Sequence, residues 1–94
     1  MKNHHNADID RLFKAILSLE TVEECHDFFD DACTVKEINE ISQRLLAAVM
    51  LREGKSYVEI SKQTGMSTAT ISRVNKCLEY GNGGYDRALE RIKN

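Results

Sequence analysis

Apolar side chains recur every three or four positions along most of the chain, with polar residues between them. This spacing is typical of an amphipathic helix, which buries one face and exposes the other. The first such stripe is Ile9, Leu12, Phe13, Ile16 and Leu17. The whole pattern predicts six helices, over residues 8–19, 22–32, 35–53, 57–64, 68–79 and 84–93. The sequence therefore predicts an all-α fold.

Three of these helices follow a capping box, in which a Ser or Thr and a Glu three residues later satisfy free backbone N–H groups. The boxes are Thr21–Glu24, Thr34–Glu37 and Ser56–Glu59. Gly54 follows the third helix and can adopt the left-handed conformation that terminates a helix. The chain has no proline, and its only glycine cluster lies at residues 81–84, which favours helices over strands joined by tight turns.

The length of 94 residues suits one compact domain rather than two. A domain of this size buries only about 60–65% of the surface that its unfolded chain exposes, so its core is marginal and dimerisation would enlarge it. No apolar run approaches the roughly 18 residues that span a bilayer. The start, MKNHHNADID, lacks the apolar segment of a signal peptide. We therefore expect a cytoplasmic protein without a membrane segment.

The formal net charge of −2 conceals an uneven distribution. Residues 1–40 carry ten acidic and four basic side chains, a net of −6, whereas residues 41–94 carry nine basic and five acidic, a net of +4. A basic half permits binding to DNA, because phosphates attract cations whatever the base sequence.

Residues 56–74, SYVEISKQTGMSTATISRV, meet the requirements of a helix-turn-helix. Its helices cross closely, which calls for a small residue at the contact, and its turn needs a residue that tolerates positive φ. Ser61 is the small residue, and Gly65 stands in the turn. The apolar side chains that hold the second helix from behind are Ile60, Met66, Ile71 and Val74.

The side chains expected to face outward are small or hydrogen-bonding near the start of the second helix and cationic farther along. This distribution suits a recognition helix whose first turn meets base edges. Free N–H groups at the two helix N-termini, after Ser56 and Ser67, can also bind phosphate. For Arg73, contact with a phosphate is favoured over contact with a base or a ligand. The candidate DNA-binding residues are Ser56, Lys62, Gln63, Ser67, Thr68, Ala69, Thr70, Ser72, Arg73 and Lys76.

The stretch TVKEINEISQRLLAAVMLREGKSYVEISKQTGMSTATISRV resembles the tryptophan repressor superfamily, especially its bacterial YerC/YecD-type branch. The resemblance implies a six-helix fold, a single domain over residues 1–94 and an intertwined homodimer. Residues 8–54 would form the dimerisation helices, 56–79 the helix-turn-helix and 84–93 a C-terminal helix. It also implies a sequence-specific repressor of transcription, whose paired recognition helices read a pseudo-palindromic operator in double-stranded DNA.

The superfamily's founding member holds L-tryptophan as a corepressor between the dimer core and the recognition helix. The resemblance places a candidate ligand pocket at Thr34, Arg44, Arg73 and Cys77. The sequence departs from that repressor in having Val74 in place of a glycine, Cys77 in place of a serine, and a turn one residue shorter. Because valine fills space that glycine leaves open, we expect tryptophan binding to be weak or absent, and we expect no other cofactor or effector.

Other chemistry has less support in the sequence. The potential metal ligands are His4, His5, His26, Cys25 and Cys33. The cysteines form no CxxC pair and are expected to be reduced thiols, so no metal site is expected. No nucleophile–base pair or phosphate-binding glycine loop is apparent in the sequence. We therefore expect that the protein is not an enzyme. The main alternative is a helical dimer that acts as a protein-interaction module, against which Arg73 and Lys76 argue.

Overall fold

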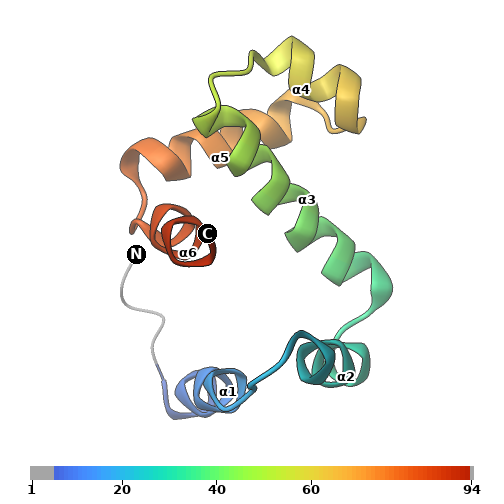
Figure 1. Ribbon diagram of the computed structural model, residues 1–94, viewed down its shortest axis with the longest axis vertical. Coiled ribbons are helices and arrows are strands. Elements are labelled where there is room, and N and C mark those ends of the chain that lie inside the picture. Colours follow the sequence, from blue (N-terminus) through green and yellow to red (C-terminus); the bar gives the residue numbers. More distant parts are fainter. Residues whose placement is uncertain (1–5, 94) are drawn as a thin grey trace. The chain divides into compact units, whose positions relative to one another are not determined.

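The computed structural model describes residues 6–93, in which all regular structure is helical (Figure 1). The helices are α1 (Ala7–Leu17), α2 (Val22–Ala32), α3 (Val35–Arg52), α4 (Tyr57–Thr64), α5 (Thr68–Tyr80) and α6 (Gly84–Ile92). The predicted all-α fold is confirmed, and the helix ends lie within two residues of those predicted. None of the described helices combines the length and the hydropathy that crossing a membrane requires.

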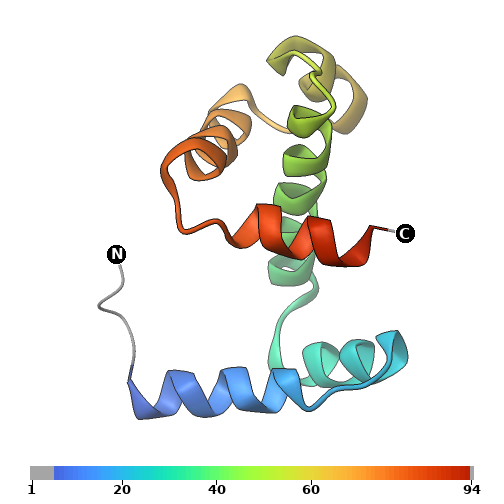
Figure 2. The ribbon, with the colours of Figure 1, turned by 60° about the vertical axis from the view of Figure 1, so that its left-hand side comes forward.

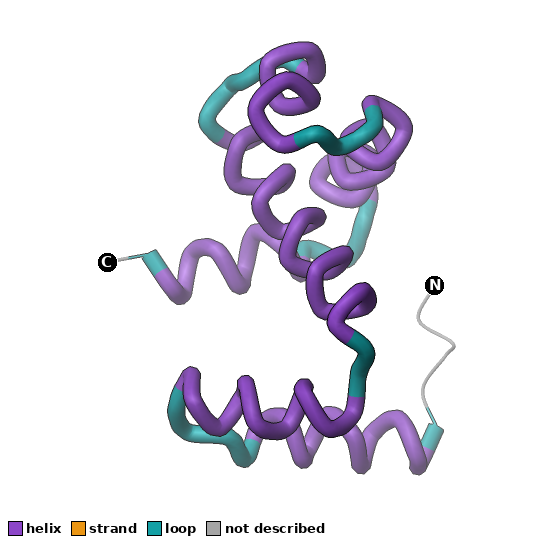
Figure 3. The backbone as a smooth tube through the Cα atoms, turned by 90° about the vertical axis from the view of Figure 1, so that its right-hand side faces the viewer, coloured by secondary structure: helices purple, strands orange, loops and turns teal. Residues whose placement is uncertain are grey.

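Two compact units divide the chain, Met1–Val35 and Lys36–Asn94. In the first unit the chain doubles back between α1 and α2 (Figures 2 and 3). Helix α2 begins after Thr21, whose hydroxyl accepts a hydrogen bond from the Glu24 N–H at 3.0 Å. The expected capping box is altered here, because the Glu24 carboxylate accepts from the N–H of Glu20, at 2.8 Å, one residue before the position predicted.

The first unit leaves its apolar side chains uncovered. Neither α1 nor α2 contains a buried residue. Phe28 and Phe29 form an edge-to-face pair with ring centroids 5.3 Å apart, yet both remain partly exposed. The exposed large apolar residues of α1 and α2 are Leu12, Phe13, Leu17 and Val22, of which Leu17 is 82% exposed. The predicted apolar stripe of the first helix is therefore present, but this unit does not bury it.

The second unit has a core that joins all four of its helices. Helix α5 crosses the C-terminal half of α3, and α4 lies beyond the end of α3 (Figure 1). The core residues are Ala47, Ala48, Met50, Ile60, Met66, Ile71, Val74 and Leu89. Helix α3 contributes only its C-terminal half, since Ile41 nearer its start is 55% exposed. The core therefore fixes α4 and α5 against the end of α3.

A glycine ends α3 at the place where the sequence predicts it. Gly54 has φ +86°, and its N–H donates to the Leu51 carbonyl at 3.0 Å. The Lys55 N–H donates to the Met50 carbonyl at 3.1 Å. These two bonds satisfy carbonyls that the helix end would otherwise leave free. The sharp stop leaves a short connection to α4.

Candidate nucleic-acid interface

A complete capping box opens α4. The Ser56 hydroxyl accepts from the Glu59 N–H at 3.1 Å, and the Glu59 carboxylate accepts from the Ser56 N–H at 2.8 Å. The hydrogen bond from the Ser56 backbone lowers the pKa of Glu59 below its ordinary value of 4.5, because it favours the ionised carboxylate. The first turn of α4 is thus fixed by its own side chains, and Ser56 is exposed there.

Three side-chain hydrogen bonds hold the turn between α4 and α5. Gly65 ends α4 with φ +80°, and the Ser61 hydroxyl donates to the Met66 carbonyl at 2.8 Å. The Thr64 hydroxyl donates to the Ile60 carbonyl at 2.6 Å and accepts from the Met66 N–H at 3.1 Å. Ser61, which the sequence assigns to the helix crossing as a small residue, therefore also fixes the turn.

The back of α5 is closed by apolar side chains. Ile60 and Ile71 are fully buried, Val74 is 2% exposed and Met66 is 8% exposed. They belong to the same core as Ala47 and Ala48 of α3. This packing matches the apolar set expected from the sequence, and it leaves the opposite side of α5 facing solvent.

The start of α5 presents small polar side chains. Ser67 accepts from the Thr70 N–H at 3.1 Å and lies 3.1 Å, hydroxyl to hydroxyl, from Thr70. Thr70 is partly buried, and its hydroxyl and N–H take part in this cap. Thr68 and Ala69 are exposed, whereas Ser72 is partly buried.

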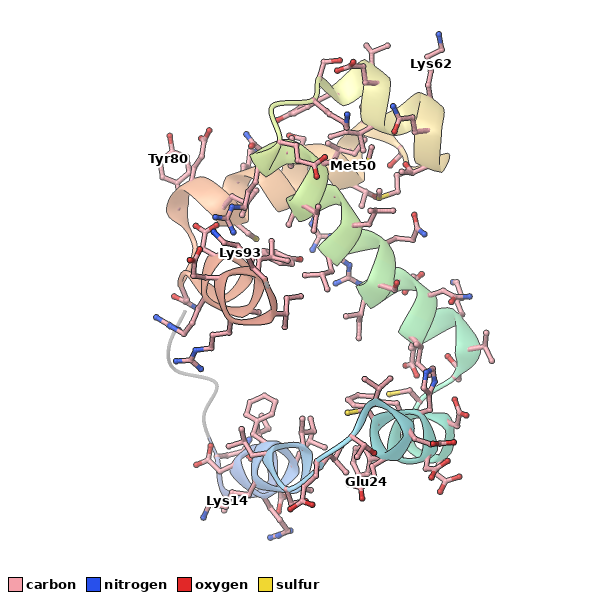
Figure 4. The ribbon with its side chains drawn as sticks, in the orientation of Figure 1. Lys14, Glu24, Met50, Lys62, Tyr80 and Lys93 are labelled. Atoms are coloured by element: carbon pink, nitrogen blue, oxygen red, sulfur yellow. The ribbon has the colours of Figure 1, made fainter. Side chains whose placement is uncertain are left out.

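The cations of this surface are unpaired. Lys62 extends outward from α4 (Figure 4) and is exposed, as are its neighbour Gln63 and the α5 residues Arg73 and Lys76. Within residues 6–93, no hydrogen bond or ion pair involves the charged groups of Lys62, Arg73 or Lys76. Arg73 and Lys76 are three residues apart and therefore share one face of α5. Three free positive charges thus flank the small side chains at the start of α5.

The candidate ligand residues are spread over both units. Thr34 precedes α3 in the first unit, and Arg44, Arg73 and Cys77 lie on α3 and α5 in the second. All four are exposed. Arg73 and Cys77 are four residues apart and lie on one face of α5. Val74, beside them in sequence, points into the core instead.

Metal-ligating residues are not gathered in the described part of the chain. Among residues 6–93 no three His, Cys, Asp or Glu side chains are placed to hold a metal ion. Cys25 and Cys33 are free thiols of intermediate exposure, and Cys77 is an exposed one. His4 and His5 lie outside the described residues.

Sequence reasoning missed two residues of this surface. Val58 is 66% exposed on the first turn of α4, four residues before Lys62 and therefore on the same face. Its spacing of four residues from Lys62 is the sequence signal that places both on one face of α4. Thr64 carries two of the three bonds of the turn, a role that only the folded geometry reveals.

The fold and the surface together define an all-helical protein that presents a helical pair with small polar side chains and free cations. The chain belongs to the Trp repressor family, because the model of the family described as Trp repressor protein matches residues 7–93. This family consists of regulatory proteins rather than enzymes. The expected membership is confirmed.

Individual relatives agree with this membership. The uncharacterized protein YerC of Bacillus subtilis (strain 168) is 57% identical over 86 residues, covering 92% of this chain and 83% of that protein. The crystal structure of a TrpR-like protein from Eubacterium eligens ATCC 27750 has a TM-score of 0.89 at 54% identity, covering 93% of this chain and 90% of the other. A proposed Trp repressor from Staphylococcus aureus has a TM-score of 0.89 at 51% identity, covering 94% and 88%. The expected six-helix TrpR-like fold is confirmed.

Proposed function

We propose that this protein is a sequence-specific regulator of transcription, a repressor, that binds double-stranded DNA through a helix-turn-helix formed by α4 and α5. The observation that carries the proposal is the two-sidedness of α5. Its back is packed into the core through Ile71 and Val74, and its front presents Thr68, Ala69 and unpaired Arg73.

The arrangement suggests a division of tasks along α5. Thr68 and Ala69, at the first turn, are small enough to let the helix approach base edges in the major groove. Arg73 and Lys76 would neutralise phosphates, as would Lys62 from α4. Backbone N–H groups at the starts of α4 and α5, beside Ser56 and Ser67, add phosphate contacts that set the register.

The protein would act as a homodimer. The exposed apolar residues of α1 and α2, including Phe13 and Leu17, need a cover that their own unit does not supply. A second copy of the chain would supply it and would enlarge a marginal core. Two-fold symmetry would then place two copies of α5 about one turn of DNA apart, so that the operator is pseudo-palindromic.

No tryptophan requirement is part of the proposal. The Val74 side chain is 2% exposed in the core between α5 and its neighbours, so the packing of α5 uses the chain's own residues. We expect the same DNA affinity with and without L-tryptophan, measured by gel shift with calorimetry of tryptophan binding in parallel. Micromolar tryptophan binding, or a gain in DNA affinity on adding it, would contradict this expectation.

The function is tested by gel shifts on genomic fragments at two salt concentrations. Each neutralised phosphate contributes about −0.9 to the slope of log affinity against log salt concentration. DNA binding through the three cations of α4 and α5 therefore predicts a steep fall with salt. A flat dependence would favour the alternative, a helical dimer that acts only as a protein-interaction module.

A further inference from the structure

A second group of unpaired cations lies on α6. These cations are separate from the DNA contacts proposed for α4 and α5. Arg87 and Arg91 line an open hollow of about 410 Å³, together with Gly83, Arg52, Asp86 and Glu90. Within the described residues, neither guanidinium takes part in a hydrogen bond or an ion pair. The two arginines are four residues apart and so lie side by side on the helix, where like charges repel.

The acidic residues of the hollow are already engaged. Arg52, at the end of α3, has its Nε 3.5 Å from Asp86 Oδ1 and an Nη atom 3.9 Å from Glu90 Oε1. Lys93 Nζ lies 3.6 Å from the second oxygen of Glu90. The carboxylates are thus balanced by Arg52 and Lys93, which leaves Arg87 and Arg91 as a free pair of guanidinium groups.

Gly83 keeps the space in front of these groups open. It has φ +79° and no side chain, and the Arg87 guanidinium lies 4.0 Å from the position that a Cβ would occupy. A side chain on residue 83 would therefore project toward the guanidinium. The glycine leaves room for another group to approach Arg87.

We propose that this hollow binds the phosphate group of a small, polar phosphorylated compound. Paired guanidinium groups suit phosphate because each donates two parallel N–H bonds to its oxygens. The volume falls in the range of small-molecule sites, and the lining residues are charged apart from Gly83, with no aromatic ring among them to stack on a base. A small compound suits the hollow better than a continuous DNA backbone, because only Arg87 and Arg91 among its charged side chains are free cations. The site is thus distinct from the proposed DNA surface.

The test is calorimetric titration of the full chain, free of DNA, with pyrophosphate at constant ionic strength. Two variants remove equal charge from different surfaces: R87Q/R91Q from the hollow and R73Q/K76Q from α5. We expect saturable binding by the wild type and by R73Q/K76Q, and at least tenfold weaker binding by R87Q/R91Q. Absence of saturable binding to the wild type would overturn the proposal, as would equal binding by R87Q/R91Q.

A second measurement keeps the hollow separate from DNA binding. The R87Q/R91Q variant should keep the wild-type salt slope for DNA, whereas R73Q/K76Q should lose slope. A smaller slope for R87Q/R91Q would assign these arginines to DNA and overturn the proposal. If the double variant does not fold, pyrophosphate-induced amide shifts in wild-type protein decide: shifts at Gly83–Arg91 support the hollow, and shifts confined to α5 contradict it.

Discussion

At the residue scale, Val74 links the stability of the core to the position of α5. Its side chain is 2% exposed and shares a core with residues of α3, α4 and α6. Val74→Gly removes that packing and adds the helix cost of glycine, so we expect a loss of about 2–4 kcal/mol of unfolding free energy. Urea denaturation measures it. The control, Lys76→Gly, changes an exposed position of the same helix and should cost only about 1 kcal/mol. Equal losses for the two variants would show that packing of the Val74 side chain does not stabilise the fold.

Gly65 is the residue on which the turn depends most. Its φ of +80° lies in the left-handed region, and a Cβ there would meet no atom within 4 Å. Gly65→Ala should therefore cost about 1–2 kcal/mol from backbone strain alone. Gly65→Asn should cost less, because asparagine tolerates this conformation better. Gly84→Ala, at an open helical position without positive φ, is the control and should be neutral or slightly stabilising. A neutral Gly65→Ala would contradict the turn geometry.

At the scale of the element, the capping box of α4 makes its stability depend on pH. The Ser56 N–H lowers the pKa of Glu59, so the ionised carboxylate stabilises the folded state. This contribution is fully present above the unfolded pKa and is lost as the pH falls through the lower, folded pKa. The difference in unfolding free energy between wild type and Glu59→Gln should therefore be largest near neutral pH. This difference should shrink below about pH 4.5. The control Glu53→Gln removes a charge without removing the capping box. A difference that stays constant with pH would contradict the role of the capping box.

Substitution of Arg73 tests whether this residue of α5 contacts a phosphate. Arg73→Ala should weaken binding equally on operator and random DNA and reduce the magnitude of the salt slope by about 0.9. Gel shifts on both DNAs at several salt concentrations measure the two effects. A loss confined to the operator would instead indicate that Arg73 reads a base.

Most of the helix pair α4 and α5 could be predicted from the sequence. The contacts that depend on how the chain folds could not. The box at Ser56, the glycine at position 65 and the apolar set behind α5 follow from local spacing. The hydroxyl bonds of Thr64 depend on how the turn closes, and the paired role of Arg52 with Asp86 depends on helices distant in sequence. Neither leaves a periodic signal. The shifted Glu24 bond likewise required the actual backbone path before α2.

At the scale of the whole molecule, the exposed apolar residues of α1 and α2 predict an interface with a second copy of the chain. Leu17 is 82% exposed, and burying such a side chain in a dimer contributes about 1.5–3 kcal/mol. Because both subunits carry the substitution, Leu17→Lys should therefore weaken dimerisation by at least roughly 100-fold. Sedimentation equilibrium measures this, with Glu23→Gln as a control that changes charge at an exposed polar position. A dissociation constant unaffected by Leu17→Lys would exclude this face from the interface.

The most direct test of the central claim is selection of bound sequences from random double-stranded DNA by the full chain without added effector. Two α5 helices related by two-fold symmetry predict enrichment of a pseudo-palindrome whose half-sites are centred about one helical turn, roughly 10 base pairs, apart. We predict enrichment of such a site, a steep fall of its binding with salt, and loss of that binding in R73Q/K76Q. Failure to enrich any sequence, or enrichment of a single half-site without symmetry, would contradict the account.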